Sequence, residues 1–329
     1  TAKGLGGQKA LEVFTEVLAK ACISTDHPRN LAFIPSAPSE YANLFDLVVG
    51  ASALYGGSWQ EGAGAVFAEN QALRWLSDLA GLPQSAGGVF VQGGTIGNLS
   101  ALVVARAEAR KKYPDTVRFA VACSEEAHSS IAGAANVMDV DVLKIATDAH
   151  GKLQGEAVGA AIDELHKSSK VRVFAVVATS GTTNLGIIDE ISAIADVAHD
   201  RNIWFHVDGA YGLAALCAPN VRAKFNGIEK ADSFIVDPHK WLFQPYDCGV
   251  VLVRHPGALE RAFAMSPEYL KDVMGGEDTV DLFNRSLELT RKTRALKLWL
   301  TFKTHGLTCI AAGIQAGMDI AVRAQGMVQ

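Results

Sequence analysis

The chain has 329 residues, of which 49% are hydrophobic and 20% charged, and its formal net charge is -5. This length can bury a large core, so we expect one large α/β domain with smaller pieces. The composition is that of a soluble globular protein and disfavours nucleic acid as a partner. The five cysteines are scattered without C-x-x-C spacing, so neither a disulfide framework nor a metal site is expected, and a reducing cytoplasm fits best. We find no signal peptide and no apolar run long enough to span a bilayer, so no membrane partner is expected.

Both ends of the sequence fall inside probable elements, which indicates a fragment or an incompletely represented chain. The first part of the chain predicts helices separated by breakers. Residues 8–21 place apolar side chains at helical spacing, and further helices are expected over 41–53 and 65–80. Residues 31–38 contain two prolines, so this segment is predicted to be an extended lead-in that lines a pocket or crosses the surface.

From residue 88 onward, short apolar runs alternate with helical patterns. This alternation predicts parallel βαβ units, and parallel sheets bind ligands at the carboxyl ends of their strands. Residues 286–303 predict a basic helix with a solvated or dimer-facing surface formed by Arg291, Lys292, Arg294 and Lys297. The predicted strands are 117–122, 141–146, 171–178, 203–207, 232–236 and 249–254, and the predicted helices between them include 155–167 and 189–200.

Two of these strands end on residues that suit the chemistry of an aldehyde. The run Ala231-Asp-Ser-Phe-Ile-Val-Asp-Pro-His-Lys-Trp241 presents Lys240 on a turn, where burial and neighbours can leave a nucleophilic amine. Asp208 ends the strand before it, and a Lys and an Asp at two strand ends suit pyridoxal phosphate, one at the aldehyde carbon and the other at the pyridinium nitrogen. Alternatively, Lys240 is a solvated surface residue, and His206 with Asp208 forms a metal pair or a core pair.

Other segments are candidates for the same site. The run Gly88-Val-Phe-Val-Gln-Gly-Gly-Thr-Ile-Gly-Asn-Leu-Ser100 predicts a strand, a glycine turn and a helix, which either binds phosphate through free N–H groups or is an ordinary bend. Ser124 and the two acids after it are predicted to open a helix as N-cap and first turn. His128 then either lies flat on a planar cofactor or is a half-buried structural residue. Residues 264–281 resemble a mobile lid that carries Tyr269.

Taken together, these motifs resemble those of the group II pyridoxal-phosphate-dependent amino-acid decarboxylases, which include the aromatic L-amino-acid, glutamate and sulfinoalanine decarboxylases. The resemblance covers nearly the whole chain. It implies an α/β fold of the aspartate aminotransferase-like type, fold type I, with a mostly parallel central sheet flanked by helices. The motifs that carry it are Gly93-Gly-Thr-Ile-Gly-Asn98, Glu126-Ala-His-Ser-Ser130, Ala178-Thr-Ser-Gly-Thr-Thr183, His206-Val-Asp-Gly-Ala-Tyr211 and Asp232-Ser-Phe-Ile-Val-Asp-Pro-His-Lys-Trp241.

Carried over residue by residue, the resemblance implies a catalytic set. Lys240 would form the Schiff base with pyridoxal 5'-phosphate, Asp208 would pair with the pyridine nitrogen, and His128 would stack on the ring. Tyr269 matches a lid tyrosine that protonates the carbanion left by departing CO2, a position at which aldehyde-forming relatives carry Phe. The implied reaction is the decarboxylation of an L-amino acid to an amine and CO2.

The same comparison implies the cofactor-binding set. Thr95, Ile96 and Ser233 match positions that bind the phosphate, and His239 lies beside them. Thr183 and Ala210 match positions that lie against the ring. Because the family is dimeric, a homodimer is expected by resemblance.

The substrate pocket is expected to have a mainly apolar wall, which favours an aromatic or bulky apolar amino acid over glutamate. The segment after Trp59, which helps to shape the pocket in family members, departs from the family pattern. Members usually carry a Ser-Pro-Ala-x-Thr-type run where this chain reads Gln60-Glu-Gly-Ala-Gly-Ala-Val-Phe-Ala-Glu69. The family's C-terminal domain is also largely absent. The expected wall residues are Phe33, Ile34, Pro35, Ser36 and Trp59.

Three divisions of the chain and three alternative functions follow. Residues 1–38 form an N-terminal helix and lead-in, 39–293 the large cofactor-binding domain, and 294–329 the start of a truncated C-terminal domain.

One alternative function is a glutamate- or aspartate-type decarboxylase. Another is an aminotransferase or lyase of the same fold, against which Pro238-His-Lys-Trp241 and Tyr269 argue. The third is an inactive fragment that binds the cofactor and serves an interaction role.

Overall fold

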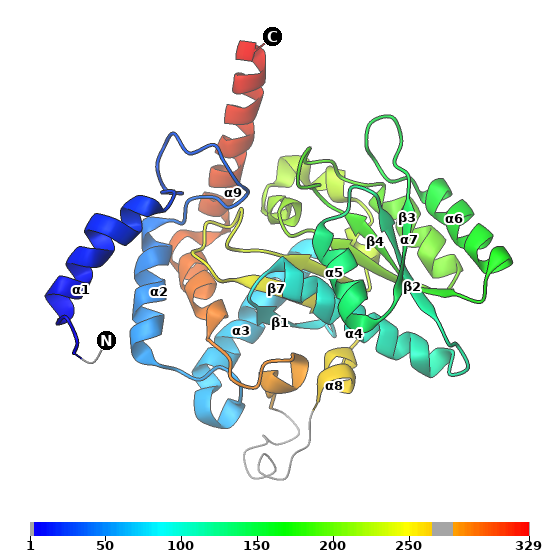
Figure 1. The fold of residues 1–329 in the computed structure, drawn as a ribbon, viewed down its shortest axis with the longest axis horizontal. Helices are drawn as coiled ribbons and strands as arrows, with labels where there is room; N and C mark the ends of the chain where they lie inside the picture. Colours follow the sequence, from blue (N-terminus) through cyan, green and yellow to red (C-terminus); the bar gives the residue numbers. More distant parts are fainter. Residues whose placement is uncertain (1–2, 265–278, 329) are drawn as a thin grey trace.

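A single mixed sheet forms the centre of the computed structural model, which describes residues 3–264 and 279–328 (Figure 1). Within these residues the strand order is β1-β7-β6-β5-β4-β2-β3. β7 is antiparallel to its neighbours β1 and β6, and all other neighbouring strands are parallel, which confirms the mostly parallel sheet. The strands are β1 (Gly87–Val91), β2 (Phe119–Ser124), β3 (Asp141–Ile145), β4 (Arg172–Thr179), β5 (Trp204–Asp208), β6 (Ser233–Val236) and β7 (Gly249–Val253).

Helices cover both faces of the sheet, so the central strands are buried on both sides, as their continuous apolar runs require. On one face, α3 (Trp59–Ala80), α6 (Gly155–Ser168) and α7 (Ile191–Asp200) pack against the sheet through one large apolar cluster. On the other face, α4 (Gly94–Lys112), α5 (Ser129–Met138) and α8 (Ala258–Phe263) complete two smaller clusters. This arrangement aligns the carboxyl ends of β4, β5 and β6 at one edge of the sheet.

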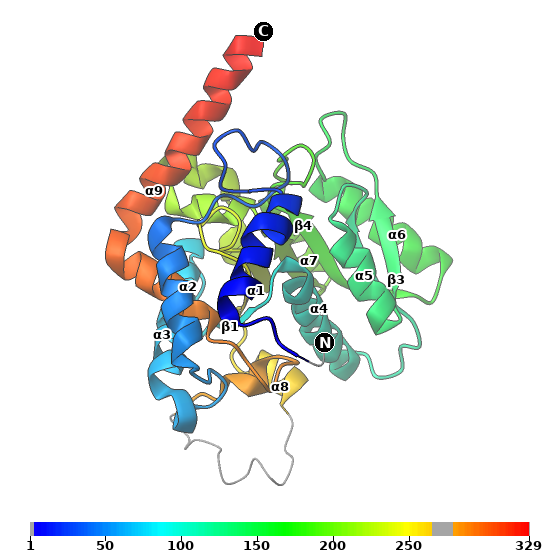
Figure 2. The same ribbon diagram turned by 60° about the vertical axis from the view of Figure 1, so that its left-hand side comes forward.

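Three helices lie at the periphery. α1 (Gly7–Val13) continues through single turns to Ala21 and buries no residue, whereas α2 (Glu40–Ser52) packs against the first part of α9 (Arg294–Val328). The second part of α9 extends away from the body of the molecule in both views (Figures 1 and 2). By length and composition, α9 could cross a membrane, which corrects the expectation that no such run exists. α9 is kinked at Gly306, which divides it into two shorter helical parts. The absence of a membrane partner stays a prediction.

Three helix boundaries differ from the predictions. α3 begins at Trp59 because the hydroxyl of Ser58 accepts a hydrogen bond from the N–H of Glu61 and caps the helix. α5 begins after His128, whose own ring caps the helix, whereas Ser124 still belongs to β2. α9 begins at Arg294, and the residues before it are mostly irregular. For α3 and α5 the side chain that caps the helix sets the boundary.

The basic residues before and in α9 are mostly buried, so the prediction of a solvated surface was wrong for them. Arg291 is 2% and Lys297 1% exposed. Arg291 Nη2 lies 2.7 Å from Glu69 Oε1, and its Nη1 donates to the carbonyl of Gly56. Lys297 Nζ lies 3.2 Å from Asp46 Oδ1. These acids come from α2 and α3, far away in the sequence, so charge alone did not reveal the pairing.

Candidate active site

A cavity of about 580 Å³ opens at the carboxyl edge of the sheet. Its walls come from the ends of β4 and β5, the turn after β6, the first turn of α4 and the residue that caps α5. This volume is within the usual range of small-molecule sites. The topology therefore brings the glycine turn, the histidine, the aspartate and the lysine of the predicted site to one place.

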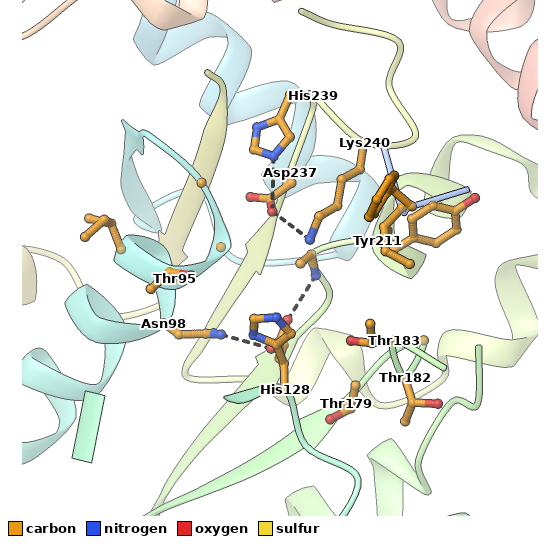
Figure 3. Close-up of a pocket in the computed structure, with 18 of the residues that line it drawn as sticks. Thr95, Asn98, His128, Thr179, Thr182, Thr183, Tyr211, Asp237, His239 and Lys240 are labelled. Carbon is orange, nitrogen blue, oxygen red and sulfur yellow. Dashed lines mark hydrogen bonds and ion pairs between the residues drawn. The ribbon is translucent and has the colours of Figure 1, made fainter. Parts of the chain in front are cut away.

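Lys240 enters this cavity from the turn that follows β6. Its Nζ lies 3.0 Å from Oδ2 of Asp237, and Figure 3 shows the Lys240 and His239 side chains directed at this carboxylate. Burial raises the pKa of Asp237, while the charges of Lys240 and His239 oppose that rise. Burial likewise lowers the pKa of His239, against the effect of Asp237. The amine is thus held at the cavity by a partner that is itself almost fully enclosed.

Asp208 is the last residue of β5, and its carboxylate is held on both oxygens. Oδ1 accepts a hydrogen bond from the N–H of Ala210 at 3.2 Å, and Oδ2 accepts one from Asn98 Nδ2 at 2.9 Å. The residue is 5% exposed and lines the cavity. A fixed, enclosed carboxylate of this kind can hold a proton on a ring nitrogen.

His128 lies across the cavity from Lys240, at the start of α5 (Figure 3). Its Nδ1 accepts a hydrogen bond from the N–H of Ser130 at 3.2 Å, so the imidazole caps the helix and its orientation is set. The ring is one of the walls of the cavity. It therefore presents a planar surface there, as stacking on a planar cofactor requires.

The first turn of α4 lines one part of the cavity, where its geometry suits an anion. Gly94, Thr95 and Ile96 line it, and the first N–H groups of a helix have no partner within the helix. A Cβ on Gly94 would lie 3.0 Å from Asp237 Oδ2 and 3.3 Å from the Cβ of Ala210, so a side chain here would force these neighbours to shift. His239, predicted to lie beside the phosphate, also lines the cavity.

The structure places most of the remaining predicted residues at the cavity. Thr183 and Ala210, expected against the ring, line it, as do Phe33 and Ile34 from the lead-in. Sequence reasoning assigned no role to three further lining residues: Asn98, Tyr211 and Asp237. Each of the three lies inside a motif that the sequence analysis identified. The motif predicts where the residue lies in the chain, but it does not predict that the side chain faces the cavity.

Four predicted residues do not line the cavity, and one cannot be placed. Ser233 begins β6 and pairs in register with His206, so it lies before the carboxyl edge; its hydroxyl bonds to His206 and Trp204. Trp59 begins α3, where its N–H donates to Asp281. Pro35 and Ser36 are also absent from the walls. Tyr269 lies outside the described residues.

The residues at the cavity fit pyridoxal phosphate. Buried Asp237 Oδ1, Thr179 Oγ1 and Ser180 Oγ at this edge have no hydrogen-bond partner among the described residues, which leaves polar capacity for a ligand. The first turn of α4 suits a phosphate, the amine of Lys240 suits an aldehyde, and Asp208 suits a protonated ring nitrogen. Among the described residues, no group of His, Cys, Asp and Glu could hold a metal ion.

Comparisons with known proteins agree with this fit. The aromatic-L-amino-acid decarboxylase of Bacillus atrophaeus is 37% identical over 308 residues, which are 92% of this chain and 63% of that protein. The L-2,4-diaminobutyrate decarboxylase of Rhizobium meliloti (strain 1021) is 34% identical over 312 residues, 92% of this chain and 61% of that protein. The chain thus spans somewhat over three fifths of these curated relatives.

Solved structures give the same result. The crystal structure of Oryza sativa TDC with PLP and tryptamine superposes with a TM-score of 0.89 at 28% identity, covering 95% of this chain and 67% of that one. The structure of mouse CSAD gives a TM-score of 0.90 at 27% identity, covering 99% of this chain and 69% of that one. The family model of the pyridoxal-dependent decarboxylase conserved domain matches residues 7–329. With its lysine, aspartate and histidine around one cavity of fold type I, the chain belongs to the pyridoxal-dependent decarboxylase family.

Proposed function

We propose that this chain catalyses the pyridoxal-phosphate-dependent decarboxylation of an L-amino acid to an amine and CO2. One observation carries the proposal: Lys240 and Asp208 line a single cavity together with the first turn of α4. These are the three groups needed for the aldehyde, the ring nitrogen and the phosphate of the cofactor. The bound cofactor supplies an electron-accepting ring for the bond that breaks.

The residues of the chain then have separate tasks. Lys240 would hold the cofactor through its amine. Asp208 would keep a proton on the ring nitrogen, and the imidazole of His128 would offer a flat surface for the ring. Tyr269 is proposed, by resemblance alone, to deliver the proton to Cα.

The proposed substrate is an aromatic or bulky apolar amino acid. Phe33 and Ile34 give the cavity an apolar side, and Tyr211, which stacks on Trp241 with ring centroids 4.9 Å apart, adds an aromatic one. The relative from Bacillus atrophaeus carries an aromatic-amino-acid name. The 34% identical L-2,4-diaminobutyrate decarboxylase makes that diamino acid the second candidate.

A panel of carboxyl-labelled L-amino acids tests both the reaction and the substrate. The cofactor-loaded chain is incubated with tryptophan, tyrosine, phenylalanine, 2,4-diaminobutyrate and glutamate, and labelled CO2 is counted. We expect release from at least one aromatic acid, faster than from glutamate. Faster release from 2,4-diaminobutyrate would replace the aromatic assignment, formation of keto acid without CO2 would indicate an aminotransferase, and release from none would overturn the proposal.

We further propose that the protein is a cytoplasmic homodimer. Its small-molecule partner is the amino-acid substrate, and neither nucleic acid nor a membrane is proposed as a partner. Several large apolar side chains on two peripheral helical segments are exposed, which supports a second copy as their cover. Light scattering coupled to gel filtration should give about twice the chain mass of 34.9 kDa, and a monomer mass at micromolar concentration would contradict the dimer. The exposed side chains include Leu11, Phe14, Leu18, Leu44 and Leu47.

A further inference from the structure

Asn98 lies at the centre of a buried hydrogen-bond network behind the cavity. It is on α4 and is 1% exposed. Its Nδ2 donates to Asp208 Oδ2 at 2.9 Å and to Ser130 Oγ at 2.8 Å, and its Oδ1 contacts His206 Nε2 at 2.9 Å. One amide group therefore joins α4 to β5 and α5, which carry the carboxylate and the histidine of the site.

The chemistry of the partners fixes the direction of these bonds. A carboxylate only accepts hydrogen bonds, so the atom of Asn98 that faces Asp208 must be the Nδ2 donor. The Oδ1 atom then faces His206 Nε2, which must carry a proton to donate. In Figure 3 the amide nitrogen of Asn98 points toward the His128 side of the cavity, and its bond to Asp208 Oδ2 is 2.9 Å long.

The hydrogen bonds at the other end of the network run in the same donor-to-acceptor direction. Burial lowers the pKa of His206, which keeps the ring neutral, so with Nε2 protonated its Nδ1 accepts from the hydroxyl of Ser233 at 2.8 Å. The Ser233 oxygen in turn accepts from Trp204 Nε1 at 2.8 Å. Every donor in this series thus points toward Asn98 and onward to Asp208, and such aligned bonds strengthen one another.

The branch through Ser130 determines the tautomer of His128. Ser130 Oγ accepts from Asn98, so its own proton is directed to His128 Nδ1 at 2.9 Å. The N–H of Ser130 donates to the same nitrogen. A nitrogen that accepts carries no proton, so the neutral ring of His128 has its proton on Nε2.

We propose that Asn98 is a positioning residue, which orients the carboxylate of Asp208 and, through Ser130, holds the ring proton of His128 on Nε2. The roles of Asp208 and His128 toward the cofactor rest on the proposed function; the hydrogen-bond order itself does not. Asn98 thereby couples the group at the ring nitrogen to the group at the ring face. Its replacement affects both at once.

The first test is the tautomer of His128 in the cofactor-free chain. Protein labelled with ¹⁵N in its histidine rings is examined by two-bond ¹H–¹⁵N correlation, and His128 is assigned from the peaks lost in His128→Gln. We expect a protonated Nε2 and an unprotonated Nδ1, and Ser130→Ala should shift the Nδ1 resonance. A proton on Nδ1 in the wild-type chain would overturn the inference.

The second test separates hydrogen bonding from packing. Asn98→Leu keeps the size of the side chain without its N–H donors and adds no charge beside Asp208, whereas Asn98→Ala removes the whole group. Both should weaken binding of pyridoxal phosphate by about tenfold to a hundredfold, since Asp208 loses a bond to its charged form. Ser100→Ala is the matched control, because Ser100 is buried on the same helix and its hydroxyl has no partner among the described residues.

The outcomes distinguish this inference from the proposed function. Asn98→Leu binding the cofactor as tightly as wild type would show that only the size of the side chain matters and would overturn the positioning role. If the tautomer and the affinities are as expected but no amino acid releases CO2, the inference stands and the proposed function fails. If the Asn98 variants do not fold, the wild-type and Ser130→Ala spectra still decide.

Discussion

The amine of Lys240 lies 3.0 Å from Oδ2 of Asp237, whose side chain is 2% exposed. Asp237 follows β6 directly, and its backbone carbonyl also accepts from the N–H of Lys240 at 2.9 Å. The turn therefore fixes both residues, and the enclosed carboxylate holds the amine at the wall of the cavity. The position of this amine is what an aldehyde of the cofactor would meet.

Asp237→Asn should slow the attachment of the cofactor. The variant replaces the carboxylate 3.0 Å from Lys240 Nζ by a neutral amide, so the amine is held less firmly at the cavity. Visible absorbance of the chain mixed with pyridoxal phosphate, followed over time, measures this. Asp232→Asn is the control, because Asp232 is also buried but pairs with His255 instead; an unchanged rate in Asp237→Asn would contradict the expectation.

His206 should make the fold less stable in acid. Burial lowers the pKa of its imidazole in the folded chain, whereas the unfolded chain has an ordinary value of about 6.5. Below that pH the unfolded state takes up a proton that the folded state does not, so the free energy of unfolding falls by up to about 1.4 kcal/mol per pH unit. Urea unfolding between neutral and mildly acidic pH measures it.

The fall should be shallower in His206→Gln. His150→Gln, which changes an exposed residue, serves as the control and should keep the wild-type slope. Equal slopes in wild type and His206→Gln would show that the pKa of His206 is not lowered in the folded chain.

The Arg291–Glu69 pair should stabilise the contact between α3 and the chain before α9. Arg291→Met leaves Glu69 charged and enclosed, so we expect a loss of about 3–5 kcal/mol in the free energy of unfolding. Lys292→Met, next in the chain and exposed, should cost far less because its pair with Asp46 is solvated. Glu69→Gln added to Arg291→Met should recover part of the loss, and full additivity of the two changes would refute the pairing.

Gly97→Ala should weaken both the fold and the cofactor site. A Cβ at this position would lie 2.9 Å from Ile235 Cγ2, so α4 would have to move away from β6. Overpacking of this size costs about 1–3 kcal/mol, and the movement displaces the first turn of α4, which lines the cavity. Gly133→Ala is the control, since its added Cβ meets nothing within 4 Å; unfolding and cofactor titration of both variants decide.

The fold was largely predictable because its strands are short apolar runs that stand out from the helical patterns between them. The β-branched run at 171–178 became β4 (Arg172–Thr179), and alternation with helices indicated parallel pairing. The order of strands along the sheet and the antiparallel β7 could not be read from local periodicity, because they depend on contacts between distant segments.

The site was predictable where a motif ends at the edge of the sheet, as at Asp208 and Lys240. Ser233 was assigned to the phosphate because the motif contains it, but strand register places it opposite His206, two residues before the edge. Asn98 received no role because its function depends on which side chains of β5 and α5 face it. Arg291 looked solvated because its partner Glu69 lies 222 positions away.

The most direct test of the account is to locate the lysine that holds the cofactor. The chain is loaded with pyridoxal phosphate, reduced with borohydride and digested, and the modified peptide is identified by mass spectrometry. We predict a phosphopyridoxyl group on Lys240, and no stable modification in Lys240→Ala, while Lys170→Ala, a change of an exposed lysine, remains labelled at Lys240. Stoichiometric labelling of another lysine, or of none, would contradict the assignment of this cavity as the active site.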